Sequence, residues 1–113
     1  MAKSNKPVVW GLFAAGGTLT AFLTPVLVVL ALLAAAGRTP ALLTYDGLLA
    51  LAESWTGKAV LFAIVFLSLW HAAHRLRITL HDLGVRSDLL VGGTLYSLAA
   101  AGCVAAASYL LKI

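Results

Sequence analysis

The chain alternates long apolar segments with short polar ones, and this pattern predicts an all-α protein whose three long helices cross a membrane. The first apolar segment, residues 8–36, carries no charge and exceeds the roughly 20 residues that a helix needs to span the hydrocarbon core. The second begins near residue 56 and continues as a helix past residue 76 to about residue 83, since Gly84 is a natural stop. The third span covers residues 89–111.

The connection between the first two spans combines a helix breaker with a mixed segment. The run Gly37-Arg38-Thr39-Pro40 ends the first helix. Residues 45–55 then place leucines beside Asp46 and Glu53, which is typical of a short interfacial helix or a loop. Trp55 closes this segment and is expected to anchor it at the membrane surface.

Composition favours a single membrane domain covering residues 1–113. Only 11% of the residues are charged and the mean hydropathy is +1.01, whereas a soluble domain of this size carries about a quarter charged residues. The positive charges lie at segment ends rather than in a basic patch among aromatic residues, which excludes nucleic-acid binding. The single Cys103 permits neither an internal disulfide nor a cysteine-based zinc or iron–sulfur site within this chain alone.

Three spans place the two termini on opposite sides of the membrane, and the basic residues predict which side is which. The side that holds the N-terminus carries Lys3, Lys6, Arg75, Arg77 and Arg86, and the other side carries Arg38, Lys58 and Lys112. Positive residues favour the cytoplasmic side. We therefore expect the N-terminus in the cytoplasm and the C-terminus in the periplasm.

The stretch "SLWHAAHRLRITLHDLG", residues 68–84, gathers the polar groups of the second span, including all three histidines. At 100° per residue, one arc of 120° contains His71, His74, Arg75, His81 and Asp82. Such a face is expected to meet protein, a ligand or a watery crevice at the cytoplasmic boundary. The alternative is that these residues reach toward lipid phosphates and only fix the orientation, an interpretation that suits Arg77 and Arg86 best.

Three chemistries could use this face. A b-type haem needs axial histidines from opposite sides, and a single helix supplies at most one of them. A metal site is disfavoured because the histidines lack the i, i+4 pair that such a site prefers. A quinone needs hydrogen-bond donors, a proton relay and an apolar slot. Arg75 could donate and stabilise negative charge, a histidine could relay protons, and Trp10 and Phe13 at the start of the first span could form the aromatic wall.

Two blocks of the sequence carry a resemblance to a known family. "PVVWGLFAAGG" (7–17) and "LWHAAHRLRITLHDLG" (69–84) resemble, at this spacing, the D subunit of bacterial fumarate reductase. This family supplies the smaller hydrophobic anchor of the four-subunit quinol:fumarate reductases, which belong to the respiratory complex II family. The resemblance covers most of the chain and is only hydropathic in the third span.

The resemblance implies a multi-pass inner-membrane protein that takes part in electron transport during anaerobic respiration. Together with its sister anchor subunit, such a protein holds the flavoprotein subunit and the iron–sulfur subunit on the cytoplasmic face. Menaquinol is oxidised near the boundary with the iron–sulfur subunit. The flavin and the iron–sulfur clusters belong to the partner subunits, so this chain contributes no catalytic residue of the fumarate reaction, and the four-subunit form usually lacks haem.

The resemblance also carries over individual site residues. Trp10, Phe13 and Arg75 match residues at or near the quinone site of the family, and His74, His81 and Asp82 match the pattern as further candidates. One departure concerns the position three residues after the arginine, where well-known relatives have a histidine and this chain has Ile78. The proton route is therefore not implied by the family pattern.

Three other functions compete with quinone binding. A purely structural anchor would leave the quinone to the partner chains, and a haem-bearing anchor of succinate dehydrogenase is a related alternative. A small transporter or channel subunit usually needs a charged residue near the bilayer centre. Residues 11–36, 59–70 and 89–111 contain none, which disfavours that class.

Overall fold

The computed structural model describes residues 5–113, and in this part of the chain every regular element is helical. In chain order these are α1 (Lys6–Ala35), the 3-10 turn η1 (Ala41–Leu43), α2 (Tyr45–Glu53), α3 (Trp55–Asp82) and α4 (Asp88–Lys112). The helices α1, α3 and α4 are long and apolar enough to cross a membrane, which confirms the three predicted spans. Lys3, one of the residues used to predict the orientation, lies outside the described residues.

The helix boundaries follow from local chemistry. α2 and α3 begin after Thr44 and Ser54, whose hydroxyls accept hydrogen bonds from the backbone N–H groups of Gly47 and Gly57. α3 ends where Gly84 adopts a φ of 97°, a conformation that favours glycine. The predicted stop at this glycine is confirmed, and the segment after residue 45 is a short helix rather than a loop.

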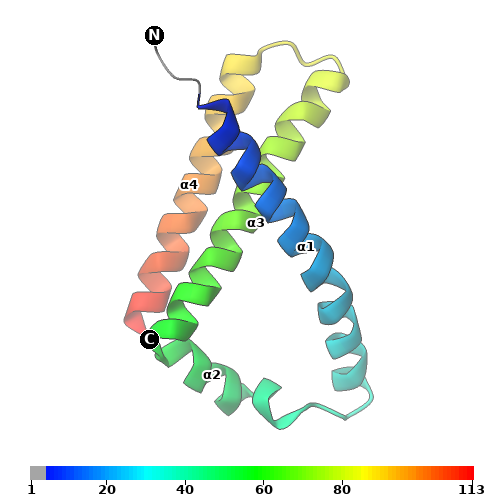
Figure 1. The fold of residues 1–113 in the computed structure, drawn as a ribbon, viewed down its shortest axis with the longest axis vertical. Helices are drawn as coiled ribbons and strands as arrows, with labels where there is room; N and C mark the ends of the chain where they lie inside the picture. The colour runs from blue at the N-terminus through cyan, green and yellow to red at the C-terminus, as the bar shows by residue number, and fades with distance from the viewer. Residues whose placement is uncertain (1–4) are drawn as a thin grey trace.

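Helix α3 is the centre of the bundle because it packs against α1, α2 and α4. Figure 1 shows α3 and α4 as an antiparallel hairpin, with α1 crossing α3 in the half of the bundle where α1 begins. Toward the other end α1 and α3 separate, and α2 connects back to the start of α3. The start of α1 and the α3–α4 connection therefore share one end, and the C-terminus lies at the opposite end.

The helices meet through small residues. The buried residues of the described chain are five glycines and alanines and one histidine: Gly16, Gly57, Ala73, His74, Gly92 and Ala99. A Cβ on Gly16 would overlap the backbone oxygen of Leu67, so the absence of a side chain is what lets α1 approach α3. Close backbone approach of this kind is the usual way in which helices associate within a bilayer. On α4, Ala99 is buried and Gly102 lies against Leu69 of α3, whereas Ala21 on α1 is exposed.

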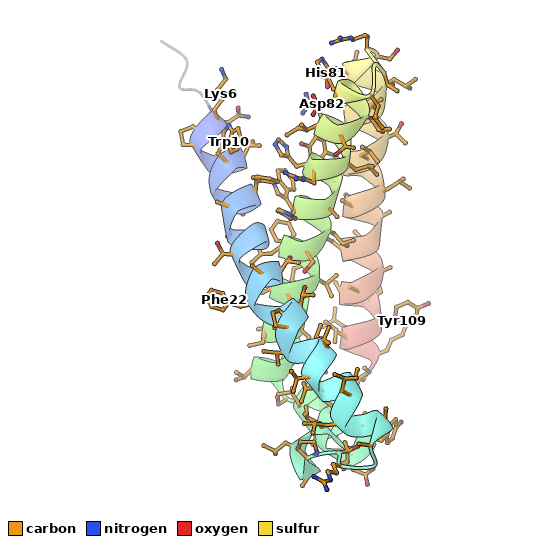
Figure 2. All side chains as sticks on the ribbon, turned by 90° about the vertical axis from the view of Figure 1, so that its right-hand side faces the viewer. Lys6, Trp10, Phe22, His81, Asp82 and Tyr109 are labelled. Atoms are coloured by element: carbon orange, nitrogen blue, oxygen red, sulfur yellow. The ribbon has the colours of Figure 1, made fainter. Side chains whose placement is uncertain are left out.

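Large apolar side chains cover the outside of the bundle. Phe22 on α1 is 74% exposed and Leu89 on α4 is 93% exposed, and Figure 2 shows Phe22 pointing away from the other helices. A soluble protein could not leave so much apolar surface in water, whereas lipid or a partner membrane chain covers it readily.

Candidate functional site

The candidate site lies at the end of the bundle where α1 begins and α3 finishes. Figure 2 shows Trp10, His81 and Asp82 at this end, and Tyr109 at the other. The ring of Phe13 stacks on His71, with 4.6 Å between centroids and 15° between planes, and lies 4.7 Å from the ring of His74. Trp10 meets His74 edge to face at 5.8 Å. The predicted approach of the aromatic block of α1 to the histidines of α3 is thus present in the structure.

His71 fastens α3 to α1. Its Nδ1 lies 3.2 Å from the backbone oxygen of Phe13. A carbonyl oxygen only accepts, so Nδ1 of His71 carries a proton and donates it. Together with the ring stacking, this hydrogen bond fixes the position of Phe13 and Trp10 along the axis of α3.

His74 is the one polar side chain that the described chain buries, with 8% of its surface exposed. Its Nδ1 lies 2.7 Å from the hydroxyl of Tyr96 on α4. Its Nε2 is buried and has no hydrogen-bond partner among the described residues. Since a buried polar group without a partner costs about 1–3 kcal/mol, the unpaired nitrogen points to a ligand or a partner-chain group.

Arg77 makes the described chain's one ion pair, with Asp88 at the start of α4. Its Nε and one terminal nitrogen donate to the two carboxylate oxygens at 2.8 and 2.6 Å. The other terminal nitrogen donates to the Tyr96 hydroxyl at 3.5 Å, and Gly92 leaves room for the guanidinium beside α4. The expectation that Arg77 merely reaches for lipid phosphates is therefore wrong, because a carboxylate and a phenol within the chain accept three hydrogen bonds from its guanidinium.

A cavity of about 250 Å³ opens beside these groups. Its wall is formed by side chains from all three spanning helices: Trp10, His74, Arg77, Ile78, His81 and Asp88. Ile78 contributes an apolar surface here. His81 is exposed and its Nε2 accepts a hydrogen bond from Arg86 at 3.3 Å, so Arg86 also has a partner within the chain.

Arg75 and Asp82 lie apart from this cavity. Both are exposed, and neither side chain has a hydrogen bond or an ion pair with another residue that the structure describes. On the helical wheel they occupy the opposite edge of the polar arc from His74 and His81. The polar face of α3 is therefore divided within this chain: His74 and His81 line the cavity beside Trp10, and Arg75 and Asp82 do not. Their role at a quinone stays a prediction.

Tyr96 and Asp88 were not predicted as members of the site. Asp88 was visible as an acidic residue just before the third span, and Tyr96 as the polar aromatic residue two turns inside it. Neither signal identifies a partner, because a helical wheel for one helix does not give the rotation of its neighbour.

Comparison with known proteins gives the family of this chain. The family model for the D subunit of fumarate reductase matches residues 1–111. The fumarate reductase D subunit of Haemophilus ducreyi is 38% identical over 102 residues, which cover 85% of this chain and 86% of that protein. The D subunit of Vibrio vulnificus is 39% identical over 106 residues, covering 92% of this chain and 83% of that protein. This chain belongs to the family of fumarate reductase D subunits and is a multi-pass membrane anchor of fumarate reductase in the bacterial inner membrane, where it associates with other subunits of that enzyme.

Proposed function

We propose that this chain, together with its sister anchor subunit, holds the flavoprotein and iron–sulfur subunits on the cytoplasmic face and contributes to the site that oxidises menaquinol. The proposed site is the end of the bundle formed by the start of α1 and the last turns of α3. Its contributing residues are Trp10, Phe13, His74 and His81 around the cavity, with Arg75 and Asp82 on the neighbouring edge of α3.

The observation that carries this proposal is the unpaired Nε2 of His74. It is buried, it belongs to a residue that lines the cavity, and the ring edge of Trp10 lies against the same imidazole. A quinone head group needs a flat apolar wall and hydrogen-bonding groups near its oxygens. Trp10 and Phe13 supply aromatic surface, and His74 supplies the polar group.

The cavity is incomplete within this chain. Its 250 Å³ falls below the roughly 300–1,000 Å³ of a typical small-molecule site. Arg75 and Asp82 sit on its outer side without partners in the described chain. Both features support a site shared with a neighbouring subunit, which would add the remaining wall and the partners of these two charges.

The charges at the same end of the bundle support the proposed orientation in the membrane. Lys6, Arg75, Arg77 and Arg86 all lie toward the start of α1 or the α3–α4 connection, whereas Arg38, Lys58 and Lys112 lie toward the other end. The positive-inside tendency then favours a cytoplasmic N-terminus and a periplasmic C-terminus. In this orientation the proposed site faces the soluble subunits.

We further propose that this chain ligates no haem and that flavin and iron–sulfur clusters reside in the partner subunits. All three histidines lie on one helix, which supplies at most one of the two axial ligands that a b-type haem needs. His74 lines a cavity that Arg77 and Asp88 also line, and such a charged wall does not suit the apolar face of a haem macrocycle. An absorption spectrum of the purified complex tests this, and a strong b-type Soret band assigned to this chain's histidines would contradict it.

Substitution of Trp10 tests the proposed site. In the purified complex, Trp10→Leu should lower menaquinol-dependent fumarate reduction by at least about tenfold, on the scale of a lost binding and positioning contact. Fumarate reduction driven by a reduced water-soluble dye should not change, because the dye delivers electrons without the quinol site. Trp55→Leu, at the opposite end of α3, is the matched control. Unchanged menaquinol oxidation in Trp10→Leu would favour the purely structural anchor.

A further inference from the structure

We propose that Tyr96 is a positioning residue which holds His74 in the tautomer with its proton on Nε2, the nitrogen that has no partner among the described residues. The tyrosine comes from the third span and its hydroxyl lies 2.7 Å from His74 Nδ1. The clamp that we infer runs from Asp88 through Arg77 and Tyr96 to His74, and thus joins α3 and α4 at the candidate site.

The direction of the hydrogen bond follows from the donors that surround the phenol oxygen. Arg77 has only donors, and one of them points at the Tyr96 oxygen at 3.5 Å. The Tyr96 O–H therefore finds its acceptor in His74 Nδ1, and a neutral imidazole that accepts at Nδ1 carries its proton on Nε2. The reverse arrangement, with Nδ1 donating, would leave the proton of this half-buried phenol without an acceptor among the described residues, which is unfavourable.

The guanidinium that directs Tyr96 is itself fixed. Two parallel hydrogen bonds to Asp88 hold Arg77 in one plane, and its central carbon lies 5.7 Å from the Tyr96 ring centroid. Gly92 packs beside the same side chain, with the Arg77 Nε 3.4 Å from the place where a Cβ would stand. Arg77 therefore acts on His74 through Tyr96, because both Arg77 and His74 form a hydrogen bond with the Tyr96 hydroxyl.

The other two histidines are held in the opposite tautomer. His71 donates from Nδ1 to the Phe13 carbonyl, and His81 accepts at Nε2 from Arg86, so both carry their proton on Nδ1 when neutral. His74 alone is expected to carry it on Nε2. The contrast makes the inference measurable within one chain of three histidines.

The consequence for the reaction rests on the proposed quinol site. His74 lines the cavity, and its Nε2 is buried without a partner among the described residues. An Nε2–H that a quinone or quinol oxygen reaches in the assembled complex would donate a hydrogen bond to it, and could not accept a proton from it in this tautomer. His74 then binds and orients the head group. Tyr96→Phe would leave the imidazole free to adopt either tautomer, so the donor at Nε2 would be present for only part of the time.

The first test reads the tautomer without any activity assay. The full-length chain, labelled with ¹⁵N-histidine and reconstituted in lipid bilayers, is studied by solid-state NMR, with His74 assigned by the signal lost in His74→Gln. We expect a neutral His74 protonated at Nε2, and in Tyr96→Phe a mixture of tautomers or a shifted Nδ1. Tyr109→Phe, a tyrosine at the other end of α4, should leave the His74 signals unchanged. A His74 proton on Nδ1, or signals insensitive to Tyr96→Phe, would overturn the clamp.

The second test measures the effect on menaquinol in the complete complex. Tyr96→Phe should raise the KM for menaquinol by about fivefold, the size expected for one weakened hydrogen bond, with a smaller change in kcat. Tyr109→Phe should change neither. An unchanged KM in Tyr96→Phe, while Trp10→Leu abolishes menaquinol oxidation, would overturn the positioning role. If Trp10→Leu also has no effect, the proposed quinol site fails, and the tautomer is still decided by the NMR spectrum.

Discussion

The last three turns of α3 have two polar sides: an inner flank of His71, His74 and Arg77, and an outer flank of Arg75 and Asp82. The two flanks differ in whether their side chains have hydrogen-bond partners within the chain. On the inner flank, His71, His74 and Arg77 each form a hydrogen bond with α1 or α4. On the outer flank, Arg75 and Asp82 are exposed, and their side chains have no hydrogen bond or ion pair with any described residue. The two flanks belong to the same helix and the same polar stretch, so the difference shows which polar groups this chain satisfies by itself.

Charged groups near the hydrocarbon region are costly unless they are paired or reach the interface. The inner flank meets this requirement through Asp88, Tyr96 and the Phe13 carbonyl. The outer flank meets it only through headgroups, water or another subunit. The inner flank is thus part of the fold, and the outer flank is the better place to look for a partner chain.

The largest effect is expected from a side chain added at Gly16, where α1 and α3 pack closely beside the inner flank. In Gly16→Ala the added methyl would overlap the Leu67 backbone oxygen and come within 2.8 Å of the His71 Cβ, which should destabilise the chain by about 1–3 kcal/mol. We expect the complex to lose this subunit during purification in detergent. Gly11→Ala on the same helix, where a Cβ meets nothing within 4 Å, is the control and should purify normally.

The next largest effect separates the two flanks directly. Arg77→Leu removes an ion pair and a hydrogen bond within the chain, so the isolated chain in detergent should unfold at a lower temperature. Arg75→Leu removes no contact that the structure describes, so its unfolding temperature should not change. In the complex, however, Arg75→Leu should lower menaquinol oxidation by about tenfold, as expected for loss of a charged hydrogen bond. Equal unfolding temperatures for the two variants would contradict the division into flanks.

A smaller effect is expected for the aromatic contact between α1 and the inner flank. Phe13→Leu removes the ring packing on His71 and His74 and should lower the free energy of unfolding by about 1 kcal/mol. Phe22→Leu on the same helix should be close to neutral, since Phe22 is exposed. Thermal unfolding of the full chain in detergent measures both. A larger loss for Phe22→Leu would show that the exposed face of α1 contributes more than the site does.

The fold was predictable because each element has a local cause. Uncharged runs longer than the bilayer core predict the spans, and Gly84 predicts the end of α3.

The candidate site was predictable only in part. The helical wheel predicted that one polar arc would gather at one end. It did not predict that His74 and Arg77 would share Tyr96, because that contact depends on the rotation of α4 about its own axis. That rotation turns the buried residues Gly92 and Ala99 of α4 toward its neighbours, and a wheel drawn for α3 contains no information about it.

The smallest effect on stability is expected for two aspartates, which lie on either side of the α3–α4 connection. Asp88 is the first residue of α4, where the helix dipole favours a negative charge, and its carboxylate accepts hydrogen bonds from Arg77. Asp82 ends α3, where the dipole disfavours it. Asp88→Asn should therefore lower the unfolding temperature of the isolated chain, whereas Asp82→Asn should raise its stability by roughly 0.3 kcal/mol at low salt. In the assembled complex the sign for Asp82→Asn should reverse if a partner chain supplies a cation to this carboxylate. Stabilisation by Asp82→Asn in both the isolated chain and the complex would mean that the outer flank stays uncovered.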